Sequence, residues 1–209
     1  MTLVGGEPTE KMIERSRFIT YSSHVESEQE AKEFLEFLKE EHPFATHICY
    51  AFVADKQGNL QRFSDNGEPQ GTAGLPILEN LKNRGLAYTC VAVVRYFGGI
   101  KLGAGGLTRA YSSCAKEHLD AADLREIKPC EVWSVAVEYS AAEPLKKFFE
   151  KRDVALLNTT YAEKAVFRVQ IKSECANALK EELTDFLCGR ADICVEERCD
   201  GYFPVQNET

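Results

Sequence analysis

Residues 95–111, RYFGGIKLGAGGLTRAY, combine a high density of glycine with positive charge. Five glycines fall within nine positions, and three basic side chains bracket them: Gly98, Gly99, Gly103, Gly105 and Gly106, with Arg95, Lys101 and Arg109. Glycine lets the backbone approach a ligand closely, and the free amides at the start of a helix attract anions. Arginine can add two parallel hydrogen bonds to a phosphate. The segment is therefore predicted to bind a phosphate, on a small molecule or on a nucleic-acid backbone.

Two observations limit this prediction. Neither the G-x-x-x-x-G-K-[ST] spacing nor the G-x-G-x-x-G spacing of nucleotide-binding loops occurs in the segment. Glycines at such density also form tight turns that allow close packing, with no ligand involved. Both a phosphate site and a packing role are therefore open for this segment.

A second group of polar residues lies in RFSDNGEPQGTAG, residues 62–74. Asp65 and Glu68 flank a turn-forming Asn-Gly pair, with Arg62 just before them and His47 upstream. Two carboxylates beside an arginine and an imidazole can act as an acid/base pair or hold a divalent cation. Turn formation alone also explains Asp65, and no nucleophile with a partner base is identifiable. Asp65, Glu68 and His47 are thus candidate catalytic residues, and Arg62 is grouped with the predicted ligand-binding residues.

Charge is distributed unevenly along the chain. The 209 residues include 25 Lys and Arg against 33 Asp and Glu, a net charge of −8 that argues against a general polyanion binder. No acidic residue occurs between Glu79 and Glu117, whereas this interval holds six basic ones: Lys82, Arg84, Arg95, Lys101, Arg109 and Lys116. The alternative to a functional basic surface is that acids from elsewhere in the chain fold back and neutralise this stretch.

Composition excludes several classes of protein. Hydrophobic residues at 44% and charged residues at 28% are typical of a globular protein, and no apolar run reaches membrane-helix length. The N-terminus lacks the apolar segment of a secretory signal, so we expect a cytoplasmic protein that does not bind membranes. The eight cysteines are scattered, mostly in apolar stretches, and form no C-x-x-C pair, which predicts reduced thiols and no metal site. No cofactor is predicted.

The first half of the chain predicts alternating helices and strands around these motifs. A capping box at Ser27–Glu30 starts a helix that ends at His42-Pro43. Strands at residues 46–55 and 60–65 form a predicted hairpin, followed by a short helix at 76–84. The apolar run 88–97 is typical of a central strand, and the stripe from Leu107 to Ala122, which includes His118 as a core residue, predicts a helix. The glycine-rich segment therefore joins a strand to a helix.

The pattern restarts after Lys128-Pro129. Strand, helix and strand periodicities follow in the order βαββαβ, at residues 133–139, 145–149, 154–161, 165–171, 179–187 and 193–199. This order is the ferredoxin-like motif. We therefore divide the chain into domains 1–128 and 129–209, and we expect residues 201–209 to form a frayed tail.

Four segments together resemble the IMPACT family, including its YigZ-type bacterial members: SRFI at 16–19, ATHICYAF at 45–52, RFSDNGEPQGTAGLPIL at 62–78 and VRYFGGIKLGAGGLTRAYS at 94–112. The resemblance extends from residue 16 to about residue 120. It implies an α/β (α+β) protein whose N-terminal domain is like the second domain of ribosomal protein S5. Its C-terminal ferredoxin-like domain is expected to be similar to those of elongation factor G. The two motif loops of the family correspond here to residues 62–74 and 95–109.

Function follows from this resemblance together with the basic segment. The eukaryotic member regulates translation by binding a protein, which implies a translation-associated regulator here. We expect its partner to be RNA or a ribosome-associated component, bound through a phosphate-like anion at the glycine-rich segment, or a protein surface. An enzyme acting on a phosphorylated or nucleotide ligand, assisted by Asp65 or Glu68, is the alternative, and a pure protein-interaction module is the third reading. The sequence favours a role without catalysis and does not define the oligomeric state.

Overall fold

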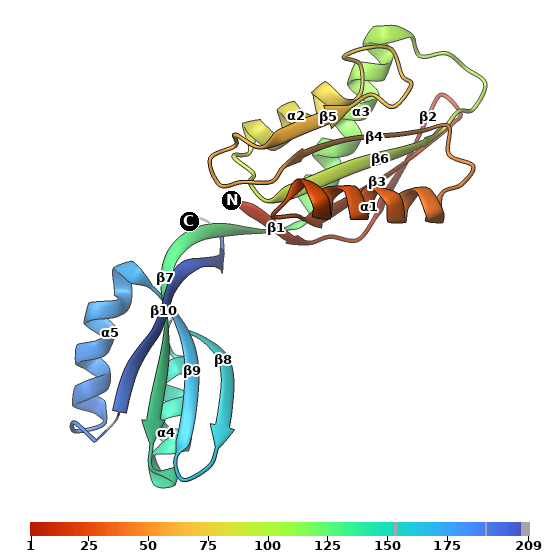
Figure 1. Ribbon diagram of the computed structural model, residues 1–209. Coiled ribbons are helices and arrows are strands. Elements are labelled where there is room, and N and C mark those ends of the chain that lie inside the picture. The colour runs from red at the N-terminus through yellow and green to blue at the C-terminus, as the bar shows by residue number, and fades with distance from the viewer. Residues whose placement is uncertain (153, 191, 206–209) are drawn as a thin grey trace. The chain divides into compact units, whose positions relative to one another are not determined.

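A computed structural model describes residues 1–152, 154–190 and 192–205, and it divides the chain into two compact units (Figure 1). The first unit comprises Met1–Arg125 and the segment that begins at Pro204, and the second comprises Glu126–Phe203. Each unit contains helices packed on an antiparallel sheet. The protein is therefore a two-domain α+β protein, as the sequence predicts. Within the described ranges, no helix has the length and apolar character needed to cross a membrane.

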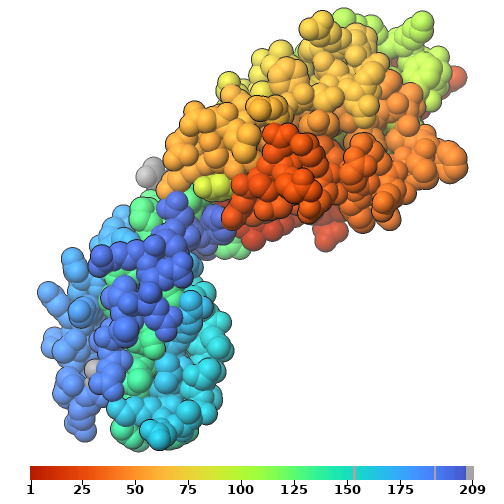
Figure 2. All heavy atoms as spheres, viewed as in Figure 1, coloured from red at the N-terminus to blue at the C-terminus, as the bar shows by residue number. Residues whose placement is uncertain are grey.

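The first unit is built on a sheet with the strand order β2-β3-β6-β4-β5. The strands are β2 (Thr9–Ile13), β3 (Ser16–His24), β4 (His47–Val53), β5 (Gln61–Ser64) and β6 (Thr89–Tyr96), and every neighbouring pair is antiparallel. Helix α1 (Glu28–Glu41) covers one face, and α2 (Gly74–Asn83) and α3 (Gly103–Ala121) cover the other (Figure 1). The outer side of α1 lies at the surface in Figure 2.

The central strand β6 shows why the sheet needs helices on both faces. Val91 and Val93 pack with α2 and α3, whereas Ala92 and Val94 pack with α1. All four side chains are fully buried. A strand that contributes alternate residues to two cores reads as a continuous apolar run, which is the pattern predicted for residues 88–97.

Helix α1 begins at the predicted capping box. The Ser27 hydroxyl accepts a 3.1 Å hydrogen bond from the Glu30 amide, as expected. The Glu30 carboxylate accepts hydrogen bonds from the amide of Glu26 at 2.9 Å and from the Ser27 hydroxyl at 3.2 Å, in place of one from the Ser27 amide. The predicted hairpin of β4 and β5 and the predicted helix α2 are also present.

The hairpin of β2 and β3 was not predicted from the sequence. Ile13 pairs with Ser16 across a two-residue turn formed by Glu14 and Arg15, whose φ angles are 45° and 64°. Such turns need left-handed backbone at both residues and usually contain Asn-Gly or Asp-Gly. The sequence at this turn therefore carries no hairpin signal. Strand β1 (Thr2–Gly5), which pairs with Asp123–Arg125, was missed as well.

The second unit has the predicted βαββαβ order. Its elements are β7 (Asp123–Val137), α4 (Tyr139–Glu150), β8 (Val154–Tyr161), β9 (Ala165–Lys172), α5 (Ser173–Phe186) and β10 (Asp192–Pro204). Strand β10 pairs with β7, which pairs with β9, and β9 pairs with β8. Trp133, Phe149 and Phe167 are fully buried in its core.

The two ends of this unit differ in detail from the sequence expectations. The structure divides the chain after Arg125, close to the predicted boundary after Lys128, and this division falls inside the continuous strand β7. Residues 201–204 belong to β10, with Gly201 and Phe203 buried, so this part of the chain is not a frayed tail. Residues 206–209 of the expected tail lie outside the described residues.

Candidate functional site

The glycine-rich segment connects the end of β6 to α3. Helix α3 begins at Gly103, so Gly103, Gly105 and Gly106 form its first turn, earlier than the start expected at Leu107. Gly98 lies against the turn between β2 and β3, where a Cβ atom would come within 1.9 Å of the Arg15 carbonyl oxygen. Its amide donates a 3.2 Å hydrogen bond to the Ser16 hydroxyl. Close packing therefore explains Gly98, as the alternative interpretation of the sequence proposes.

A hollow of about 620 Å³ lies beside the first turn of α3 and is lined by the basic residues Lys11, Lys101 and Arg109. Gly106 and Glu14 also line it. No side chain caps this helix, whose first turn contains no acidic residue. The free amides and the helix dipole therefore give this end of α3 a positive potential.

The two exposed cations of the hollow differ from Lys11. Lys11 forms an ion pair with Glu117, whereas Lys101 and Arg109 have no ion-pair or hydrogen-bond partner among the residues that the structure describes. One guanidinium nitrogen of Arg109 lies 3.5 Å from the position that a Cβ atom would occupy on Gly105. This side chain therefore lies back along the first turn of α3. An anion in the hollow would meet both cations.

Arg95 does not belong to this exposed group. It is 4% exposed, and its guanidinium donates hydrogen bonds of 2.6 Å to Glu68 and 3.2 Å to the Ser16 hydroxyl. The Tyr111 hydroxyl donates a further 2.8 Å hydrogen bond to the same Glu68 oxygen. Arg95 therefore holds the loop, the sheet and α3 together from inside and has no free face for a phosphate.

The carboxylate of Asp65 is fully used by the backbone of its own loop. It accepts hydrogen bonds from the amides of Gly71, Ala73 and Gly74 at 2.8, 3.0 and 2.8 Å. Two of these amides belong to the N-terminus of α2, which has no side-chain cap at Ala73. Asp65 thus acts as a remote cap and loop organiser, in keeping with the turn interpretation of the sequence.

His47 and Glu68 are brought together, yet without acid/base geometry. His47 Nε2 lies 3.9 Å from the Glu68 carboxylate, and its Nδ1 donates a 2.8 Å hydrogen bond to the Asn66 carbonyl. Glu68 is 4% exposed and already accepts hydrogen bonds from Arg95 and Tyr111. These two bonds and its burial leave this carboxylate without the access to substrate that a general base needs.

The remaining predicted residue, Arg62, lies apart from the hollow. It is exposed on β5, where it donates a 2.8 Å hydrogen bond to the Gln61 carbonyl. The hollow at α3 does not include it. The structure therefore brings together Lys101, Gly106 and Arg109 out of the predicted ligand-binding set.

Acids from elsewhere in the chain neutralise part of the basic interval between Glu79 and Glu117. Arg84 and Lys116 pair with Asp120, and Arg95 pairs with Glu68. The fold-back alternative accounts for these three cations. It leaves Lys82, Lys101 and Arg109 without an acidic partner in the described part of the chain, and of these Lys101 and Arg109 line the hollow.

The buried thiols and phenol of this unit are not set up as nucleophiles. Burial raises the pKa of Cys49 to about 12 and that of Cys114 to about 11. Burial, with Cys49 beside it, also raises the pKa of Tyr111. A reactive thiol needs a lowered pKa and access to solvent. The residues described contain no group of three His, Cys, Asp or Glu side chains able to hold a metal ion.

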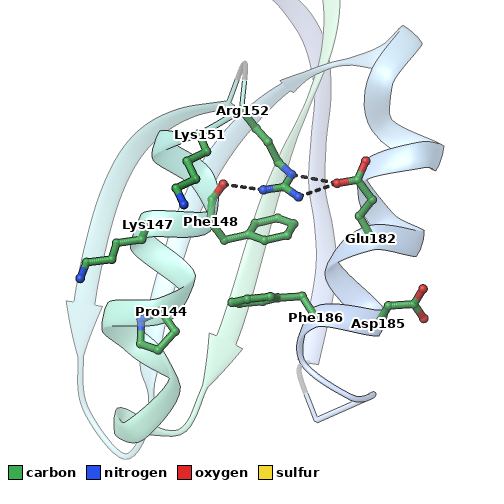
Figure 3. A pocket seen from close by; sticks show the side chains of 8 residues that line it. All are labelled: Pro144, Lys147, Phe148, Lys151, Arg152, Glu182, Asp185 and Phe186. Carbon is green, nitrogen blue, oxygen red and sulfur yellow. Dashed lines mark hydrogen bonds and ion pairs between the residues drawn. The ribbon is translucent and has the colours of Figure 1, made fainter.

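The second unit has a hollow of its own between α4 and α5 (Figure 3). The Arg152 guanidinium lies 3.5 Å above the centre of the Phe148 ring and donates a 2.7 Å hydrogen bond to Glu182. The ring centres of Phe148 and Phe186 are 4.7 Å apart. Arg152 is therefore paired with Glu182 on the neighbouring helix. None of the residues predicted to be functional lines this hollow.

Three residues at the first site were not foreseen from the sequence. Lys11 lines the hollow from β2, while Ser16 and Tyr111 bond the buried pair of Arg95 and Glu68. In the sequence, Ser16 and Tyr111 stand out only as members of SRFI at 16–19 and of residues 95–111. No spacing rule links them to Arg95, because the contacts depend on the tertiary fold.

Comparisons with known proteins give a consistent picture. Residues 14–119 match the model of the Impact N-terminal domain, and residues 135–190 match a domain of unknown function, DUF1949. The IMPACT family member YvyE of Bacillus subtilis (strain 168) is 40% identical over 184 residues, which cover 88% of this chain and 85% of the relative. The IMPACT family member YigZ of Escherichia coli (strain K12) is 34% identical over 187 residues, covering 88% and 92%.

A solved structure of related sequence supports the fold. A protein described as a hypothetical protein superposes with a TM-score of 0.60 and 31% identity, covering 94% of this chain and 96% of the other. The structure of the two-domain translational regulator Yih1 is more distant, with a TM-score of 0.36, 23% identity and coverage of 56% and 46%. A likeness at that distance supports no conclusion about function.

Proposed function

The chain belongs to the IMPACT family, and from that premise we propose that it is a translation-associated regulator that binds RNA. Its contact is the hollow at the start of α3, where backbone phosphates would meet Lys101, Arg109 and the free amides of the first turn. Membership of the family supplies the expected role in translation, through the resemblance to its eukaryotic member. The proposal of RNA as partner comes from the chemistry of the hollow.

One observation supports this proposal above the others. In this acidic protein, three of the six cations between Glu79 and Glu117 pair with acids, whereas Lys101 and Arg109 face one hollow without an acidic partner among the described residues. Exposed unpaired cations beside an uncapped helix start favour a phosphate. The alternative of an enzyme loses its assisting groups, because Asp65 bonds three backbone amides and Glu68 is buried in an ion pair.

The test is a salt titration of a fluorescent single-stranded oligoribonucleotide with the wild-type protein and a Lys101→Ala/Arg109→Ala variant. Each neutralised phosphate on a single strand contributes roughly −0.7 to the slope of log K against log salt. Removing two contacts should therefore flatten the slope by roughly 1.4 and weaken binding without changing sequence preference. Both side chains are exposed, so the variant is expected to fold normally.

A Lys146→Ala/Lys180→Ala variant is the matched control, because it removes the same charge from exposed positions on α4 and α5. It should keep the wild-type slope. Equal slopes for all three proteins would remove Lys101 and Arg109 from any role in RNA binding. The absence of RNA binding by every protein at low salt would contradict the proposal and favour a protein-interaction module.

A further inference from the structure

Phe97 has an unusual position for an exposed aromatic residue. It follows β6 directly, precedes Gly98, and is 45% exposed. Single exposed apolar side chains are common on protein surfaces and usually need no explanation. This one differs in how firmly the structure holds it.

The backbone on both sides of Phe97 is fixed by side-chain oxygens. Its own amide donates a 3.0 Å hydrogen bond to the Thr46 hydroxyl, and the next amide, of Gly98, donates one of 3.2 Å to Ser16. Gly98 itself fits so closely against Arg15 that no larger residue is accommodated. The phenyl ring is therefore attached to a backbone that cannot readily turn it inward.

The ring of Phe97 also lies on a buried cation. The Arg95 guanidinium carbon is 5.4 Å from the centre of the Phe97 ring and 5.3 Å from that of Phe18, which is fully buried. The Arg95 guanidinium thus lies within cation–π distance of an inner ring, that of Phe18, and an outer ring, that of Phe97. The ion pair with Glu68 holds that guanidinium in place. The outer ring is left as a supported, partly exposed apolar surface at the start of the glycine-rich segment.

An exposed aromatic ring in the same chain segment as a phosphate-binding surface is suited to a nucleobase. Proteins that bind single strands combine cations along the backbone with aromatic rings on which unpaired bases stack. Lys101 lies four positions after Phe97 along the chain, on the hollow that the proposed function assigns to phosphates. Bases in a duplex are already stacked and paired, so only an unpaired base can use this ring.

We propose that Phe97 stacks on an unpaired base of single-stranded RNA whose phosphates contact Lys101 and Arg109. The inference rests on the proposed function and narrows its ligand to single strands. The stacking contact adds affinity that does not depend on salt, because it neutralises no phosphate. Salt dependence and affinity are therefore expected to change separately in the two kinds of variant.

The experiment measures binding of a fluorescent single-stranded oligoribonucleotide, and of the same oligonucleotide annealed to its complement, across a range of salt. Phe97→Ala should weaken single-strand binding about ten-fold, with an unchanged salt slope and no effect on the duplex. Phe37→Ala is the matched control, because Phe37 is 54% exposed on α1 and lies outside the proposed surface. It should bind like the wild type.

A Phe97→Trp variant keeps the stacking surface and adds a direct signal. Its single-strand affinity should equal or exceed that of the wild type, and its fluorescence should be quenched by the oligonucleotide. Trp133, the other tryptophan, is buried in the second unit and supplies only a constant background. Retained folding of Phe97→Ala is checked by thermal unfolding, and the tryptophan variant tests stacking even if the alanine variant is unstable.

The outcomes separate the two proposals. Wild-type affinity in Phe97→Ala, with no quenching in Phe97→Trp, would overturn the stacking inference alone if the Lys101→Ala/Arg109→Ala variant still flattens the slope. A lack of RNA binding by the wild-type protein would overturn both. Equal weakening of single-strand and duplex binding by Phe97→Ala would also contradict stacking on an unpaired base.

Discussion

Arg95 and Glu68 form a buried ion pair in which the guanidinium and the carboxylate are 2.6 Å apart and each side chain is only 4% exposed. The two residues are 27 positions apart in the chain. Because Tyr111 and Ser16 bond the same pair, it connects β6, the loop after β5, α3 and the start of β3. The conformation of the glycine-rich segment therefore depends on a network beneath it.

Replacing Glu68 by alanine should lower the free energy of unfolding by about 3–5 kcal/mol, because it leaves the buried Arg95 guanidinium without its counter-charge. Urea denaturation measures the loss. Glu10→Ala is the control, since it breaks the exposed pair with Arg17 and should leave stability nearly unchanged. Similar losses in the two variants would show that the buried Arg95 pair contributes no more to stability than the exposed pair of Glu10 and Arg17.

A methyl group at Gly98 should disrupt the segment, whereas one at Gly105 should not. The Cβ atom of Gly98→Ala would come within 1.9 Å of the backbone of Arg15, so the chain must move. Gly105 is in a helical turn, and its nearest neighbour would be the flexible Arg109 side chain at 3.5 Å. Gly105→Ala should therefore stabilise the protein by about 0.5–1 kcal/mol. Thermal unfolding of both variants decides the point, and equal melting temperatures would contradict it.

Much of the fold could be predicted from local signals, and the failures have a physical cause. The Ser27 cap, the hairpin of β4 and β5 and the βαββαβ order all depend on residues close in sequence. The hairpin of β2 and β3 depends on left-handed backbone at Glu14 and Arg15, and neither residue type indicates that conformation. The site follows the same rule. Lys101 and Arg109 could be proposed because their spacing along the chain is a local signal.

The role of Arg95 could not be separated from that of its neighbours in the sequence. Its burial follows from its position on β6, directly opposite His47, with its side chain on the α3 face beside Phe18. Strand register and the distant Glu68 decide this, and neither is visible in a charge pattern. The turn interpretation of Asp65, one of the two that the sequence leaves open, fits the structure, because an aspartate bonding nearby amides is a local feature.

His118 should make stability depend on pH in the mildly acidic range. Burial lowers its pKa to about 4, below the value of about 6.5 in an unfolded chain. As pH falls, the unfolded chain takes up the proton first, so stability that is present above pH ~6.5 is lost progressively toward pH ~4. Between pH ~7.5 and ~5 this amounts to about 2 kcal/mol.

The measurement is chemical denaturation across this range for the wild type and for His118→Gln, which keeps a polar group near the hydroxyls of Thr9 and Ser22. Burial also lowers the pKa of His42, which adds to the acid sensitivity of both proteins. The difference between the two curves isolates His118. Parallel curves would show that His118 takes up its proton equally in folded and unfolded chains.

The thiols should separate into two reactivity classes. Cys175, Cys188 and Cys194 are exposed, whereas Cys49, Cys90, Cys114 and Cys130 are buried, and burial raises the pKa of each buried thiol. The thiolate is the reactive form, so the exposed group should be alkylated first in the folded protein. Pulse alkylation followed by mass spectrometry identifies the order. Rapid modification of Cys90 without unfolding would contradict the burial of β6.

Strand β6 supplies alternate side chains to two separate cores, and this arrangement constrains how the gene can change over time. A single inserted or deleted codon in the middle of Thr89–Tyr96 would shift the rest of the strand by one residue, so that side chains such as Val93 and Val94 would exchange layers. The Lys56–Gly58 turn lies outside the strands, so a change in its length would not move side chains between layers in this way. Among descendants of this sequence, length variation should accumulate at that turn and be absent from the middle of the sheet.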